Sequence, residues 1–357
     1  MGKNLAYFCL ALVINSIAVD LLQIEGLYAS INFYVSILTA LFAFGYVVIT
    51  QNMSKFVIKR TLEAFATVFI IASITFLVLR VIPGGPFDTD KVLPPEIMAN
   101  INAKYNLDKP LLHQYFIYIG NTLQGDLGQS YKYIGRDVSD IISEAFPNSF
   151  KLGFYSLLLA YIVGLPLGLY AAARHNTWWD SFFMFLANSG VALPSFLVAP
   201  ILIIIFSYWF KLLPPALWIG PSYYVMPVLT LGVRPSSVIA RLTRSSVLDV
   251  ISSDFIRTAR SKGLSERVVL YKHVLRNSLI PVLTISGPLI AGLLSGTFIV
   301  EHIFAIPGMG KHFIQSVTNR DYPLILGLTL LYSAILVFCN LLVDLMYAIV
   351  DPRIKLS

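Results

Sequence analysis

Long apolar runs separated by charged segments constrain the fold of this chain more than any other feature. Each of six runs after residue 61 is long enough to cross a hydrocarbon core about 30 Å thick, which takes roughly 20 helical residues. Backbone polar groups find no water inside a bilayer, so runs of this length favour helices that satisfy their own hydrogen bonds. The sequence therefore predicts an all-α, polytopic membrane protein. The predicted core spans are 62–82, 149–173, 181–210, 224–247, 279–300 and 324–350.

The composition excludes an ordinary soluble domain, because 57% of the residues are hydrophobic and only 13% are charged. The formal net charge of +7 would suggest nucleic acid in a soluble protein, but here the basic residues cluster at the ends of apolar runs. The sequence contains no G-x-x-x-x-G-K-[ST] phosphate loop, and its five histidines lack metal-binding spacing. Cys9 and Cys339 both lie inside apolar runs. We therefore expect no catalytic residue, no metal site and no cofactor.

Residues 1–52 form a separate N-terminal extension with two apolar stretches, at 5–22 and 32–50. Each stretch is just long enough to cross a membrane. We expect two extra transmembrane helices here, which would leave the orientation of the core unchanged and give eight spans in total. An upstream translation start is the alternative interpretation. A cleaved signal peptide is less favoured because no A-x-A site follows a clear apolar region.

The segment 83–148 carries no long apolar run and has eight acidic residues against five Lys and Arg. Helical periodicity alternates there with Gly and Pro breaks. We expect this segment to be an external loop region whose short helices pack over the mouth of the membrane protein.

The segment 248–277 is a charged island between two apolar runs. Between residues 241 and 276 there are eight Lys and Arg against three Asp and Glu, which predicts a cytoplasmic position. Phe255, Ile256 and Ala259 have the spacing of one helix face, and Ser253 or Asp254 can cap the start. Gly263 fits a left-handed cap at the end. A short amphipathic helix is predicted, although a basic loop that only sets topology would have a similar charge.

The amino-acid sequence of this segment resembles the cytoplasmic coupling loop of binding-protein-dependent ABC importer permeases. That family's pattern is Glu-Ala-Ala, three residues, Gly, nine residues, then Ile-x-Leu-Pro. Ala259, Gly263 and Leu275 match it, whereas Arg257, Thr258, His273 and Arg276 replace the Glu, the first Ala, the Ile and the Pro. These departures are typical of the peptide-transport branch. The resemblance implies ATPase coupling through Arg257, Thr258, Ala259, Lys262, Gly263 and Leu264.

Other motifs appear in the order expected for the same family. They are L-P-P-E, A-K-Y-N-L-D-K-P and G-D-L-G-Q-S in the external region, then E-H-I-F-A-I-P-G-M-G-K from residue 301 and N-R-D-Y-P from residue 319. Together they make residues 53–357 resemble the B-subunit branch of the oligopeptide and dipeptide permease family. The resemblance implies a six-helix permease core.

The resemblance also implies the function and the partners. A second homologous permease subunit would complete a path for oligopeptides, two cytoplasmic ATP-binding subunits would drive transport, and an external binding protein would deliver peptide. The chain would lie in the bacterial inner membrane, in contact with lipid, with the core N-terminus and the C-terminus in the cytoplasm. It would be a transport subunit and not an enzyme.

Arg234 lies about ten residues into a predicted span, roughly 15 Å deep at 1.5 Å per residue, and Pro235 follows it. A charge at that depth costs about 2.5 to 3.5 kcal/mol against lipid, so it should face a watery cavity or a partner helix. Pro194 and Pro200 interrupt another span. The four residues are candidates for lining the substrate path. The alternatives are a structural contact for the arginine and ordinary packing for the two prolines.

Two other function classes fit a polytopic chain. An ion-coupled secondary transporter of small solutes would need paired acids or histidines in mid-membrane, and Asp344 and Glu301 are poor candidates because both lie near span ends. A membrane anchor without a path is disfavoured by the many Pro and Gly breaks. An ATP-driven permease is the favoured prediction.

Overall fold

A computed structural model describes residues 54–82, 85–87, 94–294 and 298–350. Within these ranges the chain is helical, and a single isolated bridge joins Gln129 to Asp137. The predicted all-α fold class is confirmed. The elements are α3 (Ser54–Val81), α4 (Pro95–Lys104), α5 (Leu111–Leu123), α6 (Val138–Ala173), α7 (Trp178–Ala192), α8 (Ser195–Leu202), η1 (Ile203–Trp209), α9 (Pro221–Ile251), α10 (Asp254–Ser261), α11 (Glu266–Val268), η2 (Val269–Val274), α12 (Leu275–Ser278), α13 (Ile280–Leu294), α14 (Phe298–Ile303), α15 (Met309–Thr318) and α16 (Tyr322–Val350).

The chain divides into two compact units, and the predicted two-helix extension lies outside the described residues. The first unit comprises residues 1–65 and 352–357, of which the structure describes only the start of α3. In that start the Arg60 guanidinium lies 3.2 Å from the Glu63 carboxylate. The second unit, residues 66–351, holds all the other elements.

Four helical stretches are long and apolar enough to cross a membrane: Phe56–Val81, Val138–Ala173, Ile280–Ile303 and Tyr322–Asp344. The pair α7 with α8 and η1 makes a fifth if it counts as one span. Helix α9 occupies the remaining predicted position but does not meet the same criterion, because arginines, serines and prolines interrupt its apolar residues. Six helical segments therefore stand where six spans were predicted.

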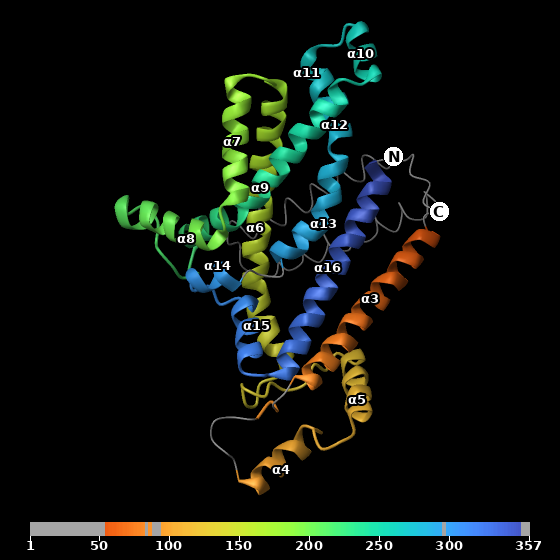
Figure 1. The fold of residues 1–357 in the computed structure, drawn as a ribbon, viewed down its shortest axis with the longest axis vertical. Helices are drawn as coiled ribbons and strands as arrows, with labels where there is room; N and C mark the ends of the chain where they lie inside the picture. The colour runs from red at the N-terminus through yellow and green to blue at the C-terminus, as the bar shows by residue number, and fades with distance from the viewer. Residues whose placement is uncertain (1–53, 83–84, 88–93, 295–297, 351–357) are drawn as a thin grey trace, which may run out of the picture. The chain divides into compact units, whose positions relative to one another are not determined.

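Two predicted spans differ in detail from the structure. The segment 181–210 is not one straight crossing, since α7 ends at Ala192 and α8 leaves it at an angle of 107° (Figure 1). Pro194 has an extended backbone at the start of α8, and it lacks the N–H that would continue α7. Helix α6 begins at Val138, eleven residues before the predicted start of the span at residue 149.

Helices α6 and α9 lie side by side along much of their length and form the centre of the second unit (Figure 1). Small residues make this possible. A Cβ on Gly164 would stand 2.7 Å from the Ser236 carbonyl oxygen, and one on Gly168 would overlap the Ala240 carbonyl. The two backbones therefore approach as closely as backbones do in membrane helix pairs with small residues at the interface.

Candidate functional site

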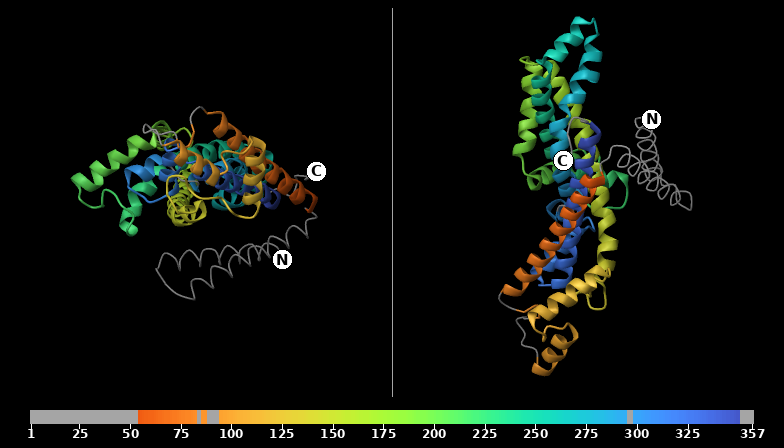
Figure 2. Two further views of the ribbon diagram at one scale, coloured as in Figure 1. Left: turned by 90° about the horizontal axis from the view of Figure 1, so that it is seen from below. Right: turned by 90° about the vertical axis from the view of Figure 1, so that its right-hand side faces the viewer.

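The charged segment after α9 projects from one end of the second unit. Figures 1 and 2 place α10 and α11 at that end, and α4 and α5 at the opposite end. The predicted inner and outer segments therefore lie at opposite ends of one helical unit.

Helix α10 is amphipathic, as predicted. Ile256 and Ala259 are buried and pack with Leu169 of α6 and Val247 of α9 in one hydrophobic cluster, which η2 completes. Phe255, predicted to share a face with these two residues, is 47% exposed and does not share their burial. It lies about 100° around the helix from Ile256, with Ala259 between them, and therefore stands at the edge of the buried side.

The two ends of α10 follow the prediction in part. Ser253 is the N-cap, but its hydroxyl donates to the Val250 carbonyl (2.6 Å) instead of capping an amide of α10. Gly263 has φ +75° and its N–H donates to the Arg260 carbonyl (2.9 Å). A Cβ at Gly263 would meet nothing within 4 Å, so the backbone conformation, and not space, favours glycine there.

The outward side of the segment carries the charges. The Arg257 side chain is 74% exposed and lies 3.5 Å from the Asp254 carboxylate, while Lys262 and Leu264 are also exposed. The Thr258 hydroxyl donates to the Asp254 carbonyl (3.0 Å). The predicted coupling residues thus form one compact element with an inward apolar side and an outward basic side.

Sequence reasoning missed an ion pair that braces this element. The Arg260 guanidinium meets the Glu266 carboxylate at 2.8 Å, across the turn that contains Gly263. The signal was available, because opposite charges flank a predicted glycine turn at a separation of six residues. The pair is solvent-exposed, so we expect it to contribute at most about 1 kcal/mol of stability.

A cavity of about 420 Å³ lies between α7, α8, α9 and α13. Arg234 and Pro235 line it, as do Leu193 and Ser195 on either side of Pro194. Pro194 itself and Pro200 are not among the lining residues, although Pro194 sets the bend beside the cavity. Helix α9 continues through Pro235 without a break.

Arg234 is exposed in the isolated chain. Within the described part of the chain its guanidinium has neither an ion pair nor a hydrogen bond. The side chain therefore borders the cavity with its charge uncompensated by any described residue.

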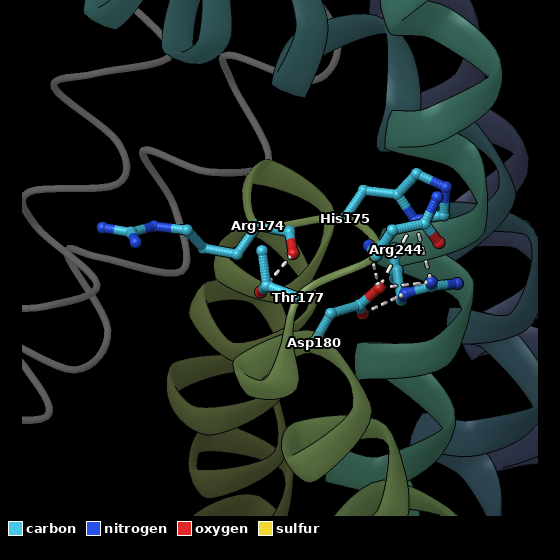
Figure 3. A network of polar contacts seen from close by, with 6 residues as sticks. Arg174, His175, Thr177, Asp180 and Arg244 are labelled. Carbon is cyan, nitrogen blue, oxygen red and sulfur yellow. Dashed lines mark hydrogen bonds and ion pairs between the residues drawn. The ribbon is translucent and has the colours of Figure 1, made fainter.

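A polar site, separate from the cavity, joins α7 to α9 through Asp180 and Arg244 (Figure 3). Asp180 is 3% exposed, and its carboxylate accepts two hydrogen bonds from Arg244, at 2.6 and 2.7 Å. The Asn176 N–H donates to the same carboxylate (3.1 Å), and His175 Nδ1 lies 3.3 Å from it. Asp180, a lone acid directly before the predicted span 181–210, was the sequence signal that we missed.

The E-H-I-F-A-I-P-G-M-G-K motif folds around the buried carboxylate of its own first residue, Glu301. Glu301 is fully buried and accepts hydrogen bonds from the Ser149 hydroxyl and the Gly310 N–H, both at 2.8 Å. A Cβ on Gly308 would lie 2.5 Å from this carboxylate, so the glycine leaves room for it. The acid therefore sits at the N-terminus of α15, where the helix dipole favours negative charge.

Two further motifs, both predicted to lie outside, contact each other. The buried Asp321 of N-R-D-Y-P accepts hydrogen bonds from the Ser130 hydroxyl and from the Tyr131 N–H (3.0 Å), which follow G-D-L-G-Q. Burial raises the pKa of Tyr131 to about 12, so its phenol stays neutral. These hydrogen bonds thus join two motifs that are almost 200 residues apart in sequence.

Comparison with known proteins identifies the family. The model of the binding-protein-dependent transport system inner membrane component matches residues 164–356, and its N-terminal companion matches residues 53–153. The dipeptide transport system permease protein DppB of Bacillus subtilis is 45% identical over 304 residues, covering 85% of this chain and 99% of that protein. The oligopeptide transport system permease protein OppB of Escherichia coli is 43% identical, covering 85% and 100%.

Among solved structures, an inward-facing MetNI methionine ABC transporter is 17% identical, with a TM-score of 0.47, and covers 59% of this chain and 96% of that chain. The family models and the full-length relatives are sufficient: the chain belongs to the family of binding-protein-dependent transport system inner membrane components.

Proposed function

We propose that this chain is the transmembrane permease subunit of an ATP-driven importer and that it forms part of the path for oligopeptides. The observation that carries the proposal is its identity of 42 to 45% over 99 to 100% of the length of permease proteins from dipeptide and oligopeptide transport systems. A second, homologous permease subunit would complete the path. Two ATP-binding subunits would supply the energy, and an external binding protein would deliver the peptide.

The segment 248–277 is the proposed contact with an ATP-binding subunit. Its basic side is exposed, while Ile256 and Ala259 attach it to the ends of α6 and α9 through shared apolar packing. A movement of the attached ATPase would therefore be passed to these two helices by a packed cluster instead of a flexible loop. Arg257, Lys262 and Leu264 are the proposed contact residues.

The cavity beside Arg234 is the proposed part of the substrate path in this subunit. Arg234 offers a guanidinium to the carboxylate of a passing peptide, a pairing that Arg favours through its planar donors. The bend at Pro194 opens the space between α7 and α8, and Pro200 belongs to the helix that follows the bend. The alternative is that Arg234 contacts an acid or backbone carbonyls of the second permease.

We also propose the topology of the chain. The charged segment 248–277, the N-terminus of the core and the C-terminus would lie in the cytoplasm, and the region around α4 and α5 would lie outside. Within the second unit, α10 and α11 lie at one end and α4 and α5 at the other, which supports the proposal for these two regions. With two spans in residues 1–52, the chain would cross the membrane eight times.

Uptake of labelled trialanine by vesicles that contain the assembled complex tests the function. We expect uptake only when ATP and the ATP-binding subunits are present, and we expect it to persist when a protonophore collapses the ion gradients. Uptake that needs a gradient but no ATPase would support an ion-coupled secondary transporter and contradict the proposal.

A further inference from the structure

A second cavity, of about 540 Å³, lies between α7 and α9 on the side toward the charged segment. Its lining is polar and includes Ser181 and Asn188 of α7 and Arg241 and Arg244 of α9. The first cavity, between α7, α8, α9 and α13, lies farther from that segment. At Gly190, which lines the first cavity, α7 and α9 approach so closely that a Cβ would overlap the Ser237 hydroxyl.

The two arginines of the second cavity differ in what they can bind. Both hydrogen bonds that Arg244 makes to Asp180 are short, so each of these residues neutralises the other. Arg241 is exposed and, within the described ranges, makes no ion pair or hydrogen bond. Arg241 is therefore the lining residue whose positive charge is available to bind an anion in this cavity.

Arg241 follows Arg234 by seven residues, which is two helical turns and about 10 Å along α9. Both side chains are exposed, and each lines one of the two cavities. An extended tripeptide is about 10 Å long at roughly 3.3 Å per residue. A short peptide that moves by its own length can therefore pass its carboxylate from one arginine to the next.

We propose that the second cavity is an inner binding site for the peptide C-terminal carboxylate, with Arg241 as its cation and Asn188 and Ser181 as hydrogen-bonding partners. This inference rests on the proposed function, and it adds that the chain selects for a free carboxylate at two successive sites. When the peptide carboxylate moves directly from Arg234 to Arg241, its negative charge stays neutralised by an arginine while the peptide crosses the membrane.

Uptake of trialanine and of its C-terminal amide by the reconstituted complex tests the inference. The quantity to compare is the ratio of variant to wild-type uptake for each peptide, because the binding protein's own preference cancels in that ratio. We expect Arg241→Gln to lower uptake of the free acid about three- to tenfold more than uptake of the amide. Arg241→Lys should restore most of the difference, and Lys151→Gln, which removes an exposed charge outside both cavities, should cause none.

Asn188→Asp provides a second variant that keeps both arginines. Its added negative charge should repel the free acid and reduce its uptake selectively, also about three- to tenfold. Equal loss for both peptides in both variants overturns the inner site while leaving the proposed function intact. Wild-type complex that imports neither peptide with ATP overturns the proposed function and the inner site together.

An anionic lipid headgroup could use the same guanidinium. The uptake assay is therefore repeated in vesicles of phosphatidylcholine alone and in vesicles with added phosphatidylglycerol. The carboxylate site predicts the same selective deficit of Arg241→Gln in both. A deficit seen only with phosphatidylglycerol would assign the cavity to lipid and overturn the proposal.

Discussion

At the scale of single residues, Gly263 ends α10 in a backbone conformation that other residues adopt at a cost. Its φ is +75°, and the space around its missing Cβ is open. A side chain there would strain the backbone by about 1 kcal/mol without displacing any atom of this chain. Any larger effect of a substitution must therefore arise where a partner approaches the turn.

We expect Gly263→Asp to abolish most ATP-driven uptake while membrane insertion and thermal stability remain close to wild type, because the added side chain blocks the contact with the ATP-binding subunit. Uptake of trialanine and the melting temperature of the purified complex are the two measurements. Gly135→Asp is the matched control, since Gly135 has φ +79° and open space but lies in the region 83–148, which is predicted to be external. Equal loss of uptake in both variants would show that backbone strain, and not coupling, is responsible.

At the scale of elements, local patterns predicted most helices and the turn at Gly263, because these depend on neighbours in sequence. Long-range contacts were not predictable. No local signal pairs Asp180 with Arg244 or Ser130 with Asp321, since each pair forms only when distant elements meet. Pro194 predicted an interruption of this span, but the angle of 107° between the two helices depends on the packing of α8 against α9 and α14. Likewise, Phe255 has the helical spacing of one face with Ala259, yet it is 47% exposed.

The ion pair between Asp180 and Arg244 should hold α7 against α9. Asp180→Asn leaves Arg244 without its counter-charge in a site where the Asp180 side chain is only 5% exposed, and we expect a lower melting temperature. Loss of one partner of a buried ion pair lowers the free energy of unfolding by about 3 to 5 kcal/mol. Because the Arg244 side chain is 24% exposed, we expect a loss at or below the lower end of this range. The double variant Asp180→Asn with Arg244→Gln should recover part of the loss. A single variant as stable as wild type would contradict this role for the pair.

At the scale of the whole molecule, the family match begins at residue 53, and the extension before it is predicted to cross the membrane twice. With Cys9 and Cys339 replaced by Ser, a cysteine in place of Glu25 should react in intact cells with an impermeant maleimide. Position 25 falls between the two apolar stretches and should therefore face outside. Labelling only after the cells are lysed would rule out the two-span extension in this orientation.

The most direct measurement of the central claim is to trap a peptide on the exposed face of α9. Val238 lies one turn from both Arg234 and Arg241, so a cysteine there, in a chain without Cys9 and Cys339, should be close to a passing peptide. An alanine tripeptide carrying an activated disulfide should modify this cysteine during ATP-driven turnover, and excess trialanine should prevent it. A cysteine in place of the exposed Ile74 of α3 serves as the control. Selective, ATP-dependent modification at position 238 is the predicted result, and equal or greater modification at position 74 would contradict it.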